Sequence, residues 1–405
     1  MAAMPRTAEI VIIGGGVHGA SLAYHLARRK VGRVVLVERK WLASGPTGRS
    51  TALVRRFYGH DFFTRTANAA ADVFQRWDER IGGDPGYRQV GYLVLTAADE
   101  AEHLARNARR AQAIGARVAL LKPAEIAALV PGLWIDDVAL ASWEAESGYA
   151  DPVATTNALA TRAREEGAAI VLDTRVDAIR VEGGPVVGVT TTAGPVAAPV
   201  VVNCAGLWAP RLLAPLGITV EVRPTRHQMC VFERPPGMAS HPAIGDRPQH
   251  TYMRPETGDL TLFGLGSHAH IEVVDPDDHD EGADPEQVLK NAELLARRIP
   301  AMEAGRVRRG YAGVYDTTPD GQPVLGAIDE YPGLFTDFGW SGHGFKHSPV
   351  IGDLLAERIV AGARADDDPL SFRPFRWRRF FEGDLIPQTS PAAPPPALAT
   401  PGVRP

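Results

Sequence analysis

Two glycine-rich segments, far apart in the sequence, carry residue types that could bind a phosphorylated ligand. The first, residues 14–19, directly follows the apolar run at residues 10–13. A strand, a tight glycine turn and a helix N-terminus in this order direct main-chain N–H groups at a pyrophosphate. The second, residues 341–346, reads Ser-Gly-His-Gly-Phe-Lys, a flexible turn that ends in a cation. We expect both segments to contact one ligand.

The first segment has the spacing G-x-G-x-x-G at Gly14, Gly16 and Gly19, which is weak evidence without supporting flanks. Here the flanks agree, because residues 17–30 have apolar side chains at helical spacing and residues 34–37 form a second apolar run. That run ends at Glu38, and an acid about 20 residues after the last glycine can accept hydrogen bonds from an adenosine ribose. The alternative is an acid at a strand end that faces water.

A loop rich in glycine and small polar residues follows at residues 42–51. Such a loop offers hydroxyl groups and main-chain donors to a ligand that lies across it. The candidate contacts are Ser44, Gly48, Arg49, Ser50 and Thr51.

Composition excludes several classes of protein. The chain has 405 residues, 45% of them hydrophobic, and a formal net charge of -5, so no basic surface indicates nucleic acid. No apolar run approaches the roughly 18 residues that a membrane-spanning helix needs, and the N-terminus lacks the apolar core of a signal peptide. We expect a cytoplasmic protein without a membrane span.

Cysteine and histidine spacing does not indicate a metal site. The two cysteines, Cys204 and Cys230, are too few for a disulfide framework and lack metal-ligand spacing. The His- and Asp-rich residues 268–279 show no helical spacing and contain a proline, so we interpret them as a solvated loop.

The pattern of expected elements predicts an α/β protein whose nucleotide-binding segments alternate with sheet-rich insertions. The chain begins with a strand–helix–strand pattern, and a helix is expected at residues 61–80. Short strands with an antiparallel-like pattern are expected after residue 220. The predicted parts are a dinucleotide-binding domain (8–82, 151–219 and 313–386), a substrate domain with an antiparallel sheet (83–150 and 220–312), and a proline-rich disordered tail (387–405).

The order of these motifs resembles the flavin-dependent amine and amino-acid oxidoreductases of the D-amino-acid oxidase superfamily, in particular the sarcosine oxidase and dimethylglycine dehydrogenase branch. The likeness covers roughly residues 8–385. It is carried by residues 14–19, residues 41–59, Asn-Cys-Ala-Gly at 203–206, Thr-Pro-Asp-Gly at 318–321 and residues 341–346. The resemblance implies FAD, bound by a Rossmann-like domain of the glutathione-reductase type, with a sheet roof over the isoalloxazine ring.

The resemblance also implies a set of cofactor contacts drawn from both ends of the chain. They are Gly14, Gly16, Val17, His18, Gly19, Glu38, Arg39, Ser44, Gly48, Arg49, Ser50, Thr51, Val176, Ala205, Gly206, Trp208, Gly342, His343, Gly344 and Lys346.

Arg55 and Lys346 match the positions at which sarcosine oxidases hold the substrate carboxylate. A desolvated carboxylate needs cationic donors, and arginine suits a bidentate contact. Neighbouring side chains of a strand point to opposite faces, so only one of Arg55 and Arg56 is expected to enter the site, and we favour Arg55. Tyr252, Arg254 and Tyr315 are further pocket candidates, although a structural role is as plausible for the tyrosines.

Two departures from the family pattern affect the chemistry. The cysteine that carries covalent flavin in monomeric sarcosine oxidases corresponds to Gly313 here, so we expect non-covalent FAD. The lysine that promotes reaction with oxygen corresponds to Thr261, which favours a dehydrogenase or a slow oxidase.

These residues predict an enzyme that removes hydride from the C–N bond of a secondary or tertiary amino acid and passes electrons to oxygen or a redox carrier. One alternative is a 2-hydroxy-acid oxidase or dehydrogenase with His343 as base. A second is a flavin-bound assembly protein without turnover. A third is an NAD-dependent dehydrogenase, in which residues 341–346 have no function.

Overall fold

The computed structural model describes residues 4–266 and 272–387. Its first sheet has six strands in the order β20-β21-β13-β1-β2-β9. Neighbouring strands are parallel, except that β20 is antiparallel to β21. The strands are β1 (Ile10–Ile13), β2 (Val34–Val37), β9 (Ala169–Val171), β13 (Val200–Asn203), β20 (Val324–Ala327) and β21 (Leu334–Phe338).

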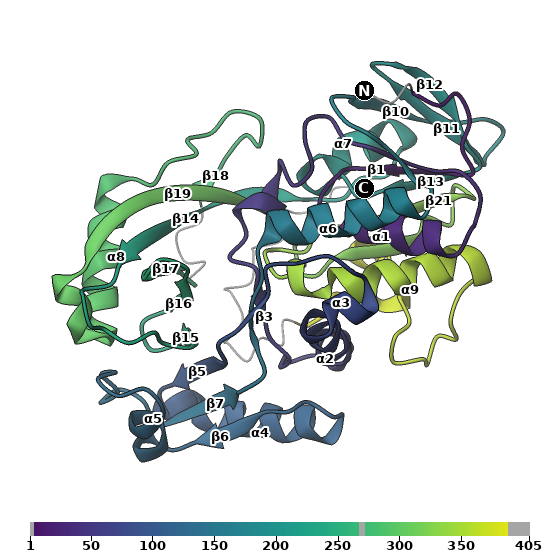
Figure 1. Ribbon diagram of the computed structural model, residues 1–405. Coiled ribbons are helices and arrows are strands. Elements are labelled where there is room, and N and C mark those ends of the chain that lie inside the picture. Colours follow the sequence, from purple (N-terminus) through teal and green to yellow (C-terminus); the bar gives the residue numbers. More distant parts are fainter. Residues whose placement is uncertain (1–3, 267–271, 388–405) are drawn as a thin grey trace.

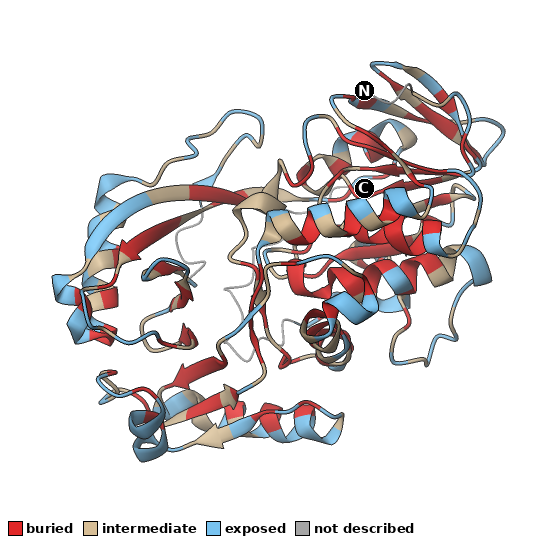
Figure 2. Ribbon diagram, in the orientation of Figure 1, coloured by how far each residue is buried: buried red, intermediate tan, exposed pale blue. Residues whose placement is uncertain are grey.

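Both faces of this sheet are covered, which explains why its strands are continuous apolar runs. Ile10 and Ile12 pack toward helices α1 (Val17–Arg28), α6 (Pro152–Glu165) and α9 (Ser348–Ala361). Val11 and Ile13 point the other way, into a cluster shared with a three-stranded antiparallel sheet. That sheet contains β10 (Val176–Val181), β11 (Val186–Thr191) and β12 (Gly194–Ala197), and α7 (Ala209–Leu213) lies beside it. Figure 2 shows the sheet as the most continuously buried part of this lobe.

A second, largely antiparallel sheet of nine strands forms the other lobe (Figure 1). Helices α4 (Ala98–Ala113), α5 (Pro123–Leu129) and α8 (Pro285–Arg298) pack against it. Its strands are β5 (Tyr92–Thr96), β6 (Ala119–Leu121), β7 (Leu140–Glu144), β14 (Arg223–Glu233), β15 (Ala243–Asp246), β16 (Thr251–Glu256), β17 (Leu260–Leu265), β18 (Glu272–Val273) and β19 (Arg306–Thr317).

The two lobes are joined by the ribbon of β14 and β19, whose pairing runs from Arg223 opposite Thr317 to Glu233 opposite Arg306. A small sheet of β3 (Leu53–Val54), β8 (Gly148–Tyr149) and β4 (Arg88–Gln89) lies between them. This mixed architecture, with an α/β sheet interwoven with an antiparallel sheet, confirms the predicted fold class.

The expected helix at residues 61–80 is two helices, α2 (Asp61–Gln75) and α3 (Trp77–Arg80). Arg76 leaves helical geometry at φ −121° and ψ 38°. This break lets the Trp77 ring stack on Phe74 at 5.2 Å between centroids, and both rings are buried. The last helix of the described residues is the short α10 (Arg379–Glu382). Residues 268–271 and 388–405, for which a loop and a disordered tail were predicted, lie outside the described residues.

Candidate active site

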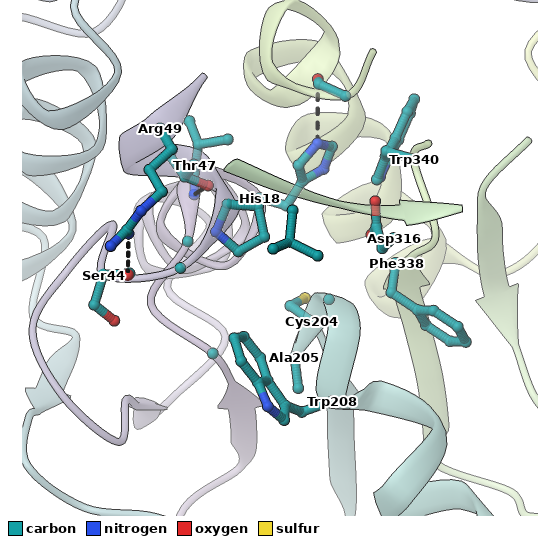
Figure 3. Close-up of a pocket in the computed structure, with 18 of the residues that line it drawn as sticks. His18, Ser44, Thr47, Arg49, Cys204, Ala205, Trp208, Asp316, Phe338 and Trp340 are labelled. Atoms are coloured by element: carbon teal, nitrogen blue, oxygen red, sulfur yellow. Dashed lines mark hydrogen bonds between the residues drawn. The ribbon is translucent and has the colours of Figure 1, made fainter. Parts of the chain in front are cut away.

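A cavity of about 380 Å³ lies between the carboxyl ends of β1, β2, β13 and β21 and the ribbon of β14 and β19. Ligands of open α/β sheets bind at this edge. The lining comes from separated stretches of chain, including the glycine turn after β1, the loop after β2, the turn after β13, and residues 313–316 and 337–345. Figure 3 shows His18, Trp208, Cys204 and Trp340 converging on this space from different elements.

The glycine turn after β1 has the geometry of a pyrophosphate site. Gly14 has φ +108°, and a Cβ there would lie 2.5 Å from the carbonyl oxygen of Cys204. At Gly19 a Cβ would lie 2.0 Å from the Gly14 carbonyl, so this glycine lets the helix start close to the turn and does not line the cavity. Gly16 is the N-cap of α1, with no side-chain cap and no acid in the first turn. The helix terminus is therefore available to an anion.

Glu38 is held in place by one donor of this turn and two donors of the segment after β2. Its Oε2 accepts the N–H of Gly15 at 2.7 Å, and its Oε1 accepts the N–H of Lys40 at 2.8 Å and the Ser44 hydroxyl at 3.3 Å. The residue is 8% exposed and lines the cavity. Glu38 therefore does not face bulk water as an ordinary strand-end acid does.

The end of the cavity next to Glu38 is lined by a cationic and an aromatic side chain, Arg39 and Trp208. The Arg39 guanidinium lies 3.7 Å from the centre of the Trp208 ring, and both residues line the cavity with Val176. Asp277, from the loop after β18, accepts from Arg39 at 2.9 Å, from Trp208 Nε1 at 3.0 Å and from Arg211. These cations lower the pKa of Asp277 to about 2 against the opposing effect of desolvation. The acid is thus ionised at neutral pH and ties this end of the cavity to the other lobe.

The loop after β2 forms one wall of the cavity through Ser44, Arg49, Ser50 and Thr51. Arg49 donates to the main-chain oxygen of Ser44 at 3.2 Å (Figure 3) and pairs with Glu281. Gly48 does not line this wall, because its missing Cβ faces the carbonyl oxygen of Ala43 at 2.3 Å. It allows the loop to close on itself.

His18 links the two glycine-rich segments. Its Nδ1 lies 2.8 Å from Oδ2 of Asp337, and its Nε2 lies 3.2 Å from the carbonyl oxygen of Gly344. Asp337 also accepts from Trp340 Nε1 at 2.7 Å. His18, Gly342 and Gly344 line the cavity, so the expectation that both segments meet one ligand site agrees with their placement.

Two tyrosines of the nine-stranded sheet, Tyr315 on β19 and Tyr252 on β16, line the cavity. Tyr315 stacks on His227 at 3.8 Å, and a Cβ at Gly342 would lie 2.2 Å from the Tyr315 ring. The Tyr252 hydroxyl donates to Met229 Sδ at 3.0 Å. Burial raises the pKa of both phenols, so they remain neutral donors at neutral pH. They form a polar but uncharged wall.

Arg55 and Lys346 share one neighbour, the buried Tyr58 ring. The Arg55 guanidinium lies 4.0 Å from its centre and the Lys346 Nζ 5.7 Å. Lys346 is 7% exposed and donates to the carbonyl oxygen of His343 at 3.1 Å. Burial and the nearby Arg55 charge lower the pKa of Lys346 well below its usual value. Neither residue lines the 380 Å³ cavity, so the pair forms a separate cationic seat.

Arg56 and Arg254, the other arginines considered for the site, pair with acids outside the cavity. Arg56 is 1% exposed and pairs with Asp72 at 2.8 Å and Glu146 at 3.3 Å. Arg254 donates to the Thr51 carbonyl at 2.8 Å and pairs with Glu256 at 2.9 Å. Both arginines are therefore structural ties between segments.

His343 is also held away from the cavity. Its Nε2 lies 3.2 Å from the Gly321 carbonyl, and its ring packs edge-on against Phe63 at 5.2 Å. Burial, then the Lys346 charge, lowers the pKa of His343 to about 3. A neutral imidazole with so low a pKa is a weak general base at neutral pH.

The family model described as "DAO: FAD dependent oxidoreductase" matches residues 9–358, and the chain belongs to this family. It is 29% identical over 379 residues to mitochondrial sarcosine dehydrogenase of Mus musculus, covering 91% of this chain and 41% of that protein. The chain thus spans less than half the length of that relative.

Solved structures show the same fold. L-proline dehydrogenase from P. horikoshii superposes with a TM-score of 0.86 at 29% identity, covering 95% of this chain and 100% of that one. Glycine oxidase from Geobacillus kaustophilus gives a TM-score of 0.79 at 26% identity, covering 92% and 99%.

The cavity fits FAD, the cofactor of this family. The open N-terminus of α1 and the Cβ-free turn would hold the pyrophosphate, Glu38 the ribose, and the part of the cavity lined by Gly342 and Tyr315 the ring. Among residues 4–266 and 272–387, no cluster of metal-binding side chains occurs. The same residues contain no helix long and apolar enough to cross a membrane.

Sequence reasoning missed part of this site. Thr47, which accepts the N–H of Val17 at 3.3 Å, Asp316 and Trp340 all line the cavity. Thr47 lies inside a loop that sequence did identify, whereas Asp316 and Trp340 carry no local signal for a cofactor.

Proposed function

We propose that this protein oxidises the C–N bond of a secondary or tertiary amino acid, with Arg55 and Lys346 holding the substrate carboxylate. The observation that carries this proposal is the pair of cations around Tyr58, a buried Lys346 and a half-buried Arg55, because cations with few buried partners are costly unless an anion compensates them. Bound FAD supplies the hydride acceptor. The names of the similar proteins, a sarcosine dehydrogenase and an L-proline dehydrogenase, support the substrate class.

The chain's own residues then orient the substrate and exclude water. A carboxylate between Arg55 and Lys346 fixes one end of the amino acid, while the neutral Tyr252 and Tyr315 form the wall that its amine end would face. Positioning of this kind accounts for a large part of the barrier reduction in bimolecular steps. No charged base is required, because the amine reacts unprotonated.

The electron acceptor is proposed to be a redox carrier rather than oxygen. Thr261, at the position where the family pattern has a lysine, is fully buried and its hydroxyl lies 2.9 Å from His241 Nε2. Burial lowers the pKa of His241 to about 4, so this pair presents no cation at neutral pH. Neither residue lines the cavity, so the pair supplies no cation to the site, and a site without one stabilises superoxide less well.

Anaerobic mixing of the flavin-loaded protein with sarcosine, dimethylglycine, proline and 2-hydroxyglutarate tests the function. We expect loss of the visible flavin absorbance with at least one of the amino acids. Bleaching by the hydroxy acid alone would contradict the proposal. An absence of bleaching with every compound would favour the flavin-bound assembly protein.

A further inference from the structure

Glu144, the last residue of β7, is a buried carboxylate behind the cationic seat. It is 0% exposed, and its Oε2 accepts the N–H of Arg56 at 2.5 Å and the Ser147 hydroxyl at 2.6 Å. Its Oε1 has no hydrogen-bond partner among the described residues. Glu144 lies opposite Tyr92 in the sheet, and the Tyr92 ring centre is 5.9 Å from the Arg55 guanidinium.

The charge of Glu144 acts on both cations of the seat. The carboxylate favours the charged forms of Arg55 and of Lys346. Arg56 does not need this anion, because Asp72 and Glu146 already pair with it. Burial raises the pKa of Glu144, while the Ser147 hydroxyl, the Arg56 N–H and the Arg55 charge oppose that rise. With all three groups charged, the seat holds two cations and one internal anion, so a single further negative charge balances it.

We propose that Glu144 is the internal counter-ion of the seat formed by Arg55 and Lys346, and that it adjusts the seat to accept one ligand carboxylate. Glu144 is a positioning residue: through the Arg56 N–H it fixes the chain beside Arg55, and through its charge it acts on Lys346. This inference rests on the proposed function and adds that the substrate is a monocarboxylate.

A proton accompanies the ligand carboxylate into the seat. Without ligand, burial and the Arg55 charge lower the pKa of Lys346, while Glu144 opposes them. A bound carboxylate supplies a second anion and favours the ammonium form. Other ionisable groups that face the cluster are Tyr58, Tyr92, His343 and His347. Burial raises the pKa of both phenols and lowers the pKa of both imidazoles, which keeps all four groups neutral. Carboxylate binding is therefore strong below the pKa of free Lys346 and weakens above it.

Acetate binding to the flavin-loaded protein tests this linkage. The Kd is measured at pH values from about 6 to about 10, with the change in flavin absorbance as the signal. Acetate is ionised throughout this range. We expect a constant Kd at the acid end and an increase of about tenfold per pH unit above the pKa of free Lys346. In Glu144→Gln the increase should begin at lower pH, because the anion that opposed deprotonation is gone. Calorimetry in two buffers of different ionisation enthalpy should show uptake of up to one proton.

Three variants keep the result interpretable. Glu146→Gln, which removes an acid paired with Arg56 and Arg117, should retain the wild-type profile. Lys346→Met should bind weakly at every pH. If Glu144→Gln does not fold, Ser147→Ala removes one donor to the carboxylate and should shift the profile in the same direction by less.

The outcomes separate the two proposals. Identical pH profiles for Glu144→Gln and the wild type would overturn the counter-ion role and leave the proposed function standing. Wild-type protein that holds flavin but shows no response to acetate at any pH would instead overturn the carboxylate seat itself.

Discussion

His18 Nδ1 lies 2.8 Å from Asp337 Oδ2, joining residues 319 positions apart in the chain. The other ring nitrogen faces the Gly344 carbonyl at 3.2 Å, so this one side chain connects the turn at the start of α1 with the turn before α9. The side chain thus holds the two glycine-rich turns together at the edge of the cofactor cavity.

His18→Ala should therefore weaken FAD binding. Loss of a charge-assisted hydrogen bond of about 1.5 kcal/mol corresponds to an increase in the Kd for FAD of about tenfold. Titration of apoprotein with FAD, followed by quenching of flavin fluorescence, measures it. His25→Ala is the matched control on the same helix, because His25 pairs with the half-exposed Asp353. An equal effect of both changes would contradict the link.

Arg55→Gln and Arg56→Gln should have opposite phenotypes although the residues are adjacent. Arg55→Gln should lower kcat/KM by about a hundredfold or more, because a buried carboxylate contact is worth roughly 3 kcal/mol, and should leave Tm nearly unchanged. Arg56→Gln should cost about 3 kcal/mol of folding stability, because Asp72 and Glu146 lose their buried partner. Steady-state kinetics and thermal unfolding distinguish them, and a reversed pattern would exchange their roles.

Gly14→Ala should abolish flavin binding. The new Cβ would lie 2.5 Å from a main-chain oxygen, at φ +108°. Gly237→Ala is the control, because Gly237 also has positive φ, +83°, but nothing lies within 4 Å of its Cβ position. The ratio of visible to ultraviolet absorbance after purification reports flavin content. Normal flavin content in Gly14→Ala would show that the turn can relax.

Asp277→Asn should speed the release of FAD, because this carboxylate of the loop after β18 accepts from Arg39, Trp208 and Arg211. Arg211 keeps a second acid of that loop, Asp275 at 3.6 Å. The pKa of Asp277 is depressed to about 2, so its ion pairs stabilise the fold at neutral pH and are lost only as pH falls from about 4 toward 2. The rate of FAD release is measured by stopped-flow mixing with an excess of another apoflavoprotein, which captures the released FAD. Asp278→Asn, at a position with no side-chain ion pair among the described residues, should leave it unchanged.

The glycine turn and the fold could be predicted from sequence because their signals are local. Gly14, Gly16 and Glu38 lie within one strand–helix–strand unit, where apolar runs and helical spacing fix each position. The ends of β14 were less predictable, because sequence indicated only short strands after residue 220. The strand runs from Arg223 to Glu233, since β19 pairs along its whole length.

The charged parts of the site depend on residues that are far apart in sequence. Alternation along the strand predicted that Arg55 and Arg56 would differ, but Asp72 and Glu146 decide which of them is a structural tie. Nothing near Glu144 or Asp277 in the sequence identifies the cations that they meet. Such pairs follow only from the packing of separate segments.

The proposed function depends on a cationic seat that holds an acid beside a flavin. Sarcosine and its carboxamide, compared in anaerobic, single-turnover reduction of the flavin-loaded protein, test this seat. We expect sarcosine, or another amino acid of this class, to bleach the flavin, and the uncharged amide to do so at least about a hundredfold more slowly. Equal rates for the acid and the amide would contradict it.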